Sequence, residues 1–212
     1  MPPKVYVASP LGFTAAGRLY SETILLPAIR AAGLEPLDPW SVEPDVLRVF
    51  ELDRDDPERR QSLGETNRRV GQRNAEMIRD AVGVLAVLDG DDVDSGTAAE
   101  IGYAAALRRP IVGLRTDLRV SGDNEATLVN LQVEWFILES GGTLATALDD
   151  ATEALAILVA HAQAVRDGTD GYLDPSTGLF VFTAAYLEAR GTCCESNCRH
   201  CPYETRPEQE PR

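Results

Sequence analysis

One stretch near the middle of this 212-residue chain, residues 85–104, limits the possible folds more than any other. It begins inside an apolar run of strand length, residues 82–88, which ends at an acidic turn that contains glycine. A helix of small residues is expected to open at about Thr97, with Glu100 in its first turn. The stretch therefore predicts a strand, a loop and a helix. Loops at the carboxyl ends of parallel strands are where α/β sheets bind ligands, so we expect the functional site here.

Two structural explanations compete with a catalytic one for these acidic residues. Thr97 and Glu100 have the spacing of a capping box, in which a hydroxyl and a carboxylate satisfy free amides at a helix start. Asp89 and Glu100 stand at the two ends of an acidic segment with the length of a calcium-binding loop. The calcium loop fails, because Val93 stands where an oxygen ligand is needed and a strand precedes the segment. The capping box stays open.

The first 165 residues alternate between strand-like and helix-like segments. Apolar runs predict strands at 4–9, 34–37, 82–88, 111–114 and 133–138. Helical spacing predicts helices at 15–32, 62–80, 96–108 and 144–164. Alternation on this scale predicts an α/β fold with a doubly wound, flavodoxin- or Rossmann-like parallel sheet of five strands. An acidic excursion separates the second strand from the second helix, and its apolar residues indicate a short helix at 46–52.

Composition narrows the function. The formal net charge is −14, the isoelectric point is about 4.5 and Lys4 is the one lysine, which argues against nucleic-acid binding. No apolar run approaches the roughly 20 residues of a membrane span, and the amino terminus lacks a signal pattern, so we expect a cytoplasmic protein. The two histidines, His161 and His200, lie far from the candidate site, so a histidine-based triad is not expected. Carboxylate chemistry is what remains.

The carboxyl-terminal part has a different character. Residues 166–171 are rich in turn formers and predict a linker between a main domain, 1–165, and a small module, 166–212. An apolar run at 179–186 has strand or short-helix character. All four cysteines follow within nine residues, and in a reducing compartment they favour a metal over disulfides. Zinc is the default and an iron–sulfur site the alternative, with free thiols as a third possibility. The candidate ligands are Cys193, Cys194, Cys198, His200 and Cys201.

The central signature resembles that of a known enzyme family. Residues 94–104, Asp-Ser-Gly-Thr-Ala-Ala-Glu-Ile-Gly-Tyr-Ala, are similar to the nucleoside 2-deoxyribosyltransferases, in which an Asp stands six residues before a nucleophilic Glu. Three further segments agree in order: Val-Tyr-Val-Ala-Ser-Pro at 5–10, Asn74 to Asp80, and Val-Asn-Leu at 129–131. The resemblance covers about residues 4–160. The carboxyl-terminal segment resembles a small cysteine-rich module of unknown function, which ends in Cys-Arg-His-Cys-Pro-Tyr.

The resemblance implies a role for each matching position and no cofactor for catalysis. It makes Glu100 the nucleophile, Tyr6 its hydrogen-bonding partner, and Asp94, beside Gly96, the ligand of the sugar hydroxyls. It places Ser9, Pro10 and Phe13 around the base. It also implies that Asn130 reaches the 5′-hydroxyl in the site of a neighbouring subunit, and hence a homo-oligomer that acts on 2′-deoxynucleosides and free nucleobases.

The chain departs from the family pattern at one point. Some members have an Asp upstream of the central strand that helps to protonate the base, whereas this region offers Gln72 and Asn74. Asn74 can hydrogen-bond the base, but the proton must then come from elsewhere, and Asp80, Asp89 and Asp92 are the candidates.

The chemistry of N-glycosidic bonds suits carboxylates. Breaking such a bond builds positive charge on the anomeric carbon, which an anion stabilises and can capture as an ester. At a helix amino terminus, Glu100 would be held ionised by the helix dipole. A related branch, the nucleoside 5′-monophosphate hydrolases, has a Ser where this chain has Asp94, and a carboxylate there would repel a phosphate. Transfer to a base, hydrolysis, and simple nucleoside binding stay open.

Overall fold

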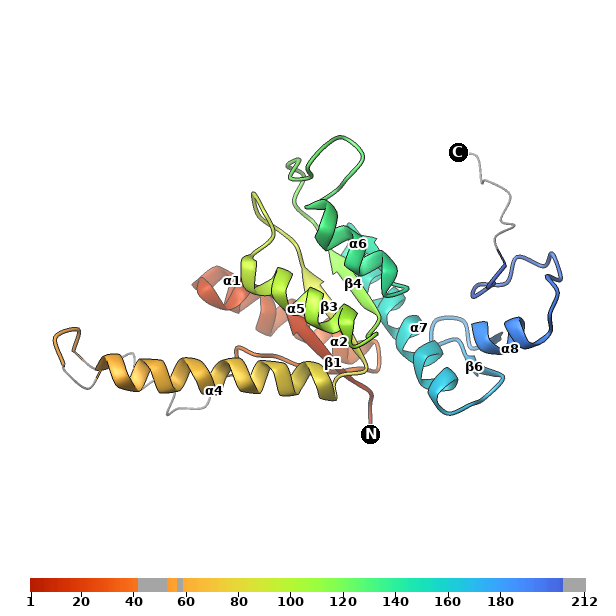
Figure 1. The fold of residues 1–212 in the computed structure, drawn as a ribbon, viewed down its shortest axis with the longest axis horizontal. Coiled ribbons are helices and arrows are strands. Elements are labelled where there is room, and N and C mark those ends of the chain that lie inside the picture. The colour runs from red at the N-terminus through yellow and green to blue at the C-terminus, as the bar shows by residue number, and fades with distance from the viewer. Residues whose placement is uncertain (42–52, 57–58, 204–212) are drawn as a thin grey trace.

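The computed structural model describes residues 1–41, 53–56 and 59–203. At its centre is a parallel sheet of five strands in the order β2-β1-β3-β4-β5 (Figure 1). The strands are β1 Lys4–Ala8, β2 Glu35–Leu37, β3 Gly83–Val87, β4 Ile111–Leu114 and β5 Thr143–Ala145. The strands β3 and β4 are buried throughout, which is why their sequences are continuous apolar runs. The predicted doubly wound α/β fold is confirmed.

Helices cover both faces of the sheet (Figure 1). Because side chains alternate along a strand, Leu85 and Val87 of β3 pack on one face and Val84 and Ala86 on the other. The first face is covered by α2 Leu26–Ala31 and α7 Leu148–Arg166. The second face is covered by α4 Arg59–Asp80, α5 Ser95–Ala106 and α6 Leu131–Glu139. Two packed cores result, one on each side of the sheet.

The strand predicted at 133–138 is wrong, because this segment forms the middle of α6. The apolar run itself has no clear period. In the structure Asn130, which precedes the run, caps the helix, and Val133 and Ile137 within it are buried four residues apart. The fifth strand is β5, in the region where a helix was expected from residue 144. That helix, α7, begins at Leu148 instead.

The other helices lie near their predicted positions. The helix expected at 15–32 is α1 Ala15–Tyr20, a π-helical turn at Ser21–Leu25 and then α2. The helix expected at 62–80 begins earlier, at Arg59. The short helix predicted at 46–52 lies outside the described residues.

The carboxyl-terminal segment follows α7 as a small unit (Figure 1). It contains the antiparallel strands β6 Gly171–Leu173 and β7 Phe180–Phe182 and the helix α8 Ala184–Ala189, so the apolar run at 179–186 holds a strand and the start of a helix. Its contact with α7 is specific: His200 stacks on His161 with ring centroids 3.7 Å apart and pairs with the Tyr172 hydroxyl at 2.7 Å. The histidines therefore attach this unit to α7.

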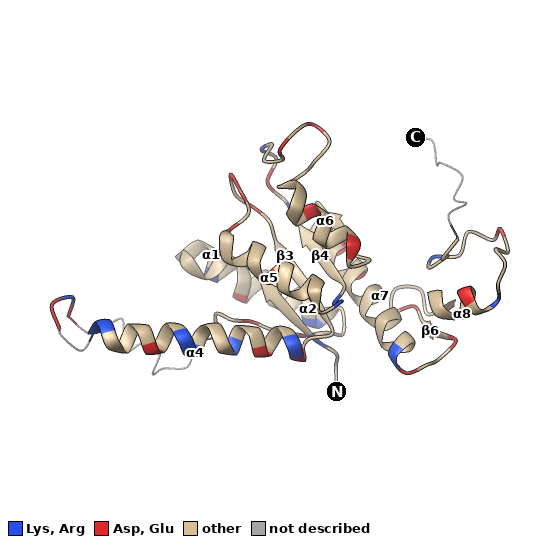
Figure 2. Ribbon diagram, viewed as in Figure 1, with Lys and Arg blue, Asp and Glu red and all other residues tan. Residues whose placement is uncertain are grey.

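Charged residues are spread over the elements without segregating by sign on the longest helix. Along α4, basic residues outnumber acidic ones, and acidic residues lie between them (Figure 2). In the described part of the chain, no helix is both long and apolar enough to cross a membrane.

Candidate active site

The site centres on the carboxylate of Glu100, which side chains from two other elements hold in place. The Tyr6 hydroxyl on β1 donates a hydrogen bond to Glu100 Oε1 at 2.7 Å. The Asn74 amide on α4 donates to the same oxygen at 3.4 Å. Tyr6 is fully buried and the other two are half-buried. Three residues that the sequence analysis singled out in separate segments thus meet at one carboxylate.

The start of α5 differs from the expected capping box. Asp94 is the cap, and its Oδ2 accepts from the Thr97 amide at 3.0 Å. The helix begins at Ser95, so Glu100 lies beyond the first turn and its carboxylate does not bond the Thr97 amide. The prediction that the helix terminus holds Glu100 ionised is therefore wrong, because the dipole effect fades after the first turn. Gly96 lies in that turn, where a Cβ would approach Asp94 Oδ2 to 3.0 Å.

The electrostatics of the site suit a poised nucleophile. Burial raises the pKa of Glu100, and the charge of Asp94 raises it further, while the hydrogen bonds from Tyr6 and Asn74 act in the opposite direction. The pKa of Tyr6 lies far above its ordinary value, first because of burial and then because of the Glu100 charge. Tyr6 therefore remains a hydrogen-bond donor over the whole physiological pH range.

Asn74 has a second polar atom that faces no partner. Its Oδ1 is buried and accepts no hydrogen bond from any described residue. A buried acceptor without a donor is costly, and such atoms in native proteins need an explanation. An N–H or O–H group of a bound molecule beside Glu100 would satisfy it.

The first loop carries an aromatic pair. Ser9 is buried, and its carbonyl accepts from the Trp40 indole nitrogen at 2.8 Å. Pro10 precedes the 3-10 turn η1 Leu11–Phe13, and the Phe13 ring packs edge-on against Trp40 with centroids 4.6 Å apart. Gly12 is required beneath this pair, since a Cβ there would lie 1.8 Å from the Trp40 ring. Trp40 was not predicted as a site residue, because a single large aromatic residue in a polar segment does not by itself indicate a site.

Asn130 has a structural role at the start of α6. It caps α6, and its Oδ1 accepts from the amides of Gln132 and Val133. The helix that follows exposes apolar side chains at helical spacing: Leu131, Trp135 and Leu138 are 51%, 57% and 49% exposed.

Asp89 and Asp92, two of the candidate proton donors, form hydrogen bonds with loop residues. Asp89 accepts hydrogen bonds from the Thr116 amide, the Thr116 hydroxyl and the Asp117 amide, all within 2.9 Å. Asp92 accepts from the adjacent Val93 amide. Both carboxylates therefore have local structural partners.

The cysteines lie in two pairs. Cys193 and Cys201 have sulfur atoms 3.9 Å apart, and Cys194 and Cys198 have theirs 3.5 Å apart. His200 is engaged with Tyr172 and His161 instead. Within residues 1–41, 53–56 and 59–203, no group of three or more candidate ligands converges. The metal site stays a prediction.

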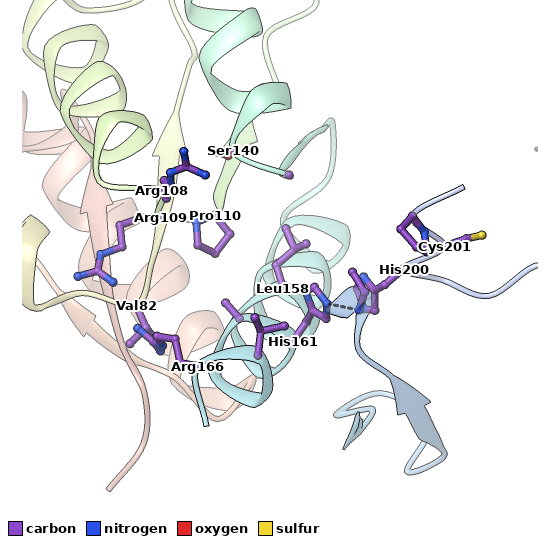
Figure 3. A pocket seen from close by; sticks show the side chains of 15 residues that line it. Val82, Arg108, Arg109, Pro110, Ser140, Leu158, His161, Arg166, His200 and Cys201 are labelled. Atoms are coloured by element: carbon purple, nitrogen blue, oxygen red, sulfur yellow. Dashed lines mark hydrogen bonds between the residues drawn. The ribbon is translucent and has the colours of Figure 1, made fainter. Parts of the chain in front are cut away.

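A cavity of about 590 Å³ separates the cysteine loop from the sheet (Figure 3). It is lined by Val82 and Pro110, which precede β3 and β4, and by Leu158, His161 and His200. This cavity lies at the amino-terminal edge of the sheet, opposite the edge that bears Asp94, and no carboxylate lines it.

Comparisons with known proteins agree with this geometry. A family model described as nucleoside 2-deoxyribosyltransferase matches residues 5–132, more than half of the chain, and a family of unknown function (DUF5522) matches residues 160–207. A conserved protein from Enterococcus faecalis V583 is 23% identical, with a TM-score of 0.54, over 73% of this chain and 98% of its own. A 2-desoxiribosyltransferase from Leishmania mexicana is 21% identical, with a TM-score of 0.51, over 73% of this chain and 97% of its own. At these identities the two structures show a shared fold.

Proposed function

Because the chain belongs to the nucleoside 2-deoxyribosyltransferase family, we propose that it transfers 2-deoxyribose between nucleobases through a covalent intermediate on Glu100. The observation that carries the proposal is the hydrogen bond from the buried Tyr6 hydroxyl to Glu100 Oε1. A carboxylate oriented by a permanent donor is suited to attack, whereas a simple binding site has little need for an anion at the anomeric carbon.

The proposed reaction has two displacements. Glu100 attacks the anomeric carbon as the first base leaves, and a glycosyl ester forms. A nitrogen of the second base then attacks the same carbon and releases Glu100. Asp94 uses Oδ2 to cap α5, and Oδ1 is its proposed ligand for the sugar hydroxyls. Ser9, Pro10, Phe13 and Asn74 are proposed to contact the base.

A chromatographic assay tests the proposal. The purified protein is incubated with a panel of 2′-deoxynucleosides, each with and without a different free base. A new deoxynucleoside that forms only with the acceptor base is the expected product. Base release without exchange would make the reaction a hydrolysis, and no turnover with any donor would leave nucleoside binding as the function.

Tyr6→Phe is expected to shift the pH profile of transfer. The hydroxyl stabilises the ionised form of Glu100, so its removal raises the pKa of that carboxyl further. The acid limb of kcat/KM then moves to higher pH. A charge-assisted hydrogen bond is worth about 1.5–3 kcal/mol, so we expect a loss of roughly 10- to 100-fold at neutral pH. An unchanged acid limb would contradict the role of Tyr6.

We also propose a homo-oligomer in which Asn130 completes the site of a neighbouring subunit. The exposed apolar face of α6 supports it, since exposed contiguous apolar surface marks interaction sites. Asn130→Asp retains an acceptor for the helix cap but loses the amide donor, and we expect roughly tenfold lower transfer. Mixed oligomers of Asn130→Ala and Glu100→Ala chains should regain activity, because some sites then combine both native residues. No recovery in hybrids of confirmed composition would contradict sharing.

We propose a boundary between the main domain and the carboxyl-terminal module at residues 165/166, close to the start of the match of the second family model at 160–207.

We also propose a structural zinc site in the carboxyl-terminal module. Four thiols in one loop, already in two close pairs, support a soft metal. Metal analysis of protein purified without chelators should find about one zinc per chain, lost in Cys198→Ser. Iron with sulfide would indicate a cluster, and metal-free protein would leave free thiols.

A further inference from the structure

The proposed reaction lacks an assigned proton donor for the departing base. The base leaves with the electron pair of the C–N bond, and protonation of a nitrogen makes this departure easier. Glu100 is occupied as the nucleophile and Asp94 caps α5. Asp89 and Asp92 have local partners, and Asp80 is exposed at the end of α4. A different acid is needed near the base.

The pairing of strands β2 and β1 places Asp38 next to the site. It follows β2 directly, and its neighbour Leu37 is in register with Tyr6 on β1. Asp38 is half-buried, and its Oδ1 accepts from the Trp40 amide at 3.0 Å. Its other oxygen has no hydrogen bond to any described residue. The hydrogen bond to Oδ1 thus fixes the side chain, and the second oxygen is available to exchange a proton with a bound molecule.

The turn that carries Asp38 contacts both the first loop, at Ser9 and Phe13, and helix α4, at Arg73. Trp40 bonds to the Ser9 carbonyl and packs on Phe13, as described above. On the other side, the Arg73 guanidinium donates to the Ser41 carbonyl at 3.0 Å, one residue before Asn74 on α4. Asp38 therefore lies between an aromatic pair suited to stack on a planar base and the helix that supplies Asn74.

The surroundings of Asp38 shift the pKa of its carboxyl group upward. Burial raises the pKa of this carboxyl, and the charge of Glu22 adds to the increase. The Trp40 amide, Arg30 and Arg73 act in the opposite direction without cancelling it. The charge of Asp38 also raises the pKa of Tyr6, so Asp38 is within electrostatic reach of the Tyr6–Glu100 pair.

We propose that Asp38 donates the proton to the departing base and recovers it from the incoming one, an assignment that rests on the proposed transferase function. In the first step the C–N bond breaks, its electron pair takes the Asp38 proton, and the Glu100–carbon bond forms. In the second step the incoming base attacks, its N–H proton returns to Asp38, and Glu100 is released. Protons and electrons balance over the cycle, and no other reactant is needed.

The test compares donors that need a proton with donors that do not. 2′-Deoxyinosine releases a base that must be protonated, whereas its N7-methyl derivative is already cationic and releases a neutral base. For a pyrimidine-specific enzyme, 2′-deoxyuridine and its 5-nitro derivative form the matching pair. Asp38→Asn preserves the acceptor for Trp40, and Asp38→Ser is a second variant that can accept the same bond. Asp80→Asn is the control, and circular dichroism checks the fold.

Asp38→Asn should slow transfer from the ordinary donor by about 10²- to 10³-fold and leave the activated donor within a few-fold of the native rate. Asp80→Asn should change neither rate. If the native enzyme transfers sugar but Asp38→Asn slows both donors equally, or slows neither, the assignment of Asp38 is overturned. A native protein without turnover on any donor would instead overturn the proposed function, and the assignment with it.

Discussion

Glu100→Ala is expected to abolish sugar transfer, with a loss of at least about 10⁴-fold, because removing a covalent nucleophile eliminates the pathway rather than weakening it. The half-buried side chain fills no core position, so the fold should persist by circular dichroism. The measurement is the rate of deoxynucleoside formation under saturating donor and acceptor.

A matched control and a trapping experiment sharpen this result. Glu76 on α4 is exposed and, among the described residues, accepts a hydrogen bond from Gln72 alone, on its own helix. Glu76→Gln should therefore retain native activity. Intact mass spectrometry of the native protein with donor alone should show a covalent 2-deoxyribosyl adduct that Glu100→Ala lacks. Near-native turnover of Glu100→Ala would refute the covalent mechanism.

Arg115→Met should cause the largest loss of stability among the substitutions considered. Arg115 is 1% exposed and directly follows β4. Its guanidinium donates to the carbonyls of Leu88, Gly90 and Arg119 at 2.6, 3.2 and 2.8 Å. Methionine fills much of the space but leaves the buried Leu88 carbonyl and two partly buried carbonyls without their donor, and a buried unpaired group costs about 1–3 kcal/mol. We expect the free energy of unfolding to fall by roughly 2–3 kcal/mol in urea titrations.

The neighbouring Arg119 supplies the control. Its side chain is 60% exposed and pairs with Asp91, which is exposed, and with Asp117, whose side chain is 16% exposed. Exposed ion pairs contribute about 0–1 kcal/mol, so Arg119→Met should be nearly neutral. Equal effects of the two substitutions would show that the buried hydrogen bonds of Arg115 contribute little. Because Arg115 joins the loop before Asp94 to the loop after β4, a weakened site should accompany its loss.

Much of the sheet could be predicted because β3 and β4 are buried on both faces, which gives them continuous apolar sequences. The prediction at 133–138 failed because a surface helix carries a similar run: six residues without a period suit a strand or a helix equally, and the cap at Asn130 distinguishes them. Short strands such as β5, three residues long, carry almost no signal of their own.

Some residues of the candidate site could likewise be predicted from the sequence and others could not. The joint presence of Tyr6, Asn74 and Glu100 came from resemblance, since no local spacing relates residues 94 positions apart. The capping residue of α5 could not be fixed from sequence because both Asp94 and Thr97 are good caps; in the structure Asp94 caps the helix and Glu100 bonds to Tyr6 and Asn74 instead. Asp38 and Trp40 escaped notice because their relevance depends on the pairing of β2 with β1, a contact that no pattern within the segment reveals.

The placement of the cysteine loop has an evolutionary consequence. Glu100 and its partners gather where the strands end, whereas His161 and His200 join the module to the far end of α7, beside the points where β3 and β4 begin. The hydrogen-bonding partners of Glu100 and the residues of the histidine stack have no member in common. Selection can therefore alter one without retuning the other, so a lineage can acquire, lose or repurpose the appendage while its chemistry at the opposite edge is inherited unchanged.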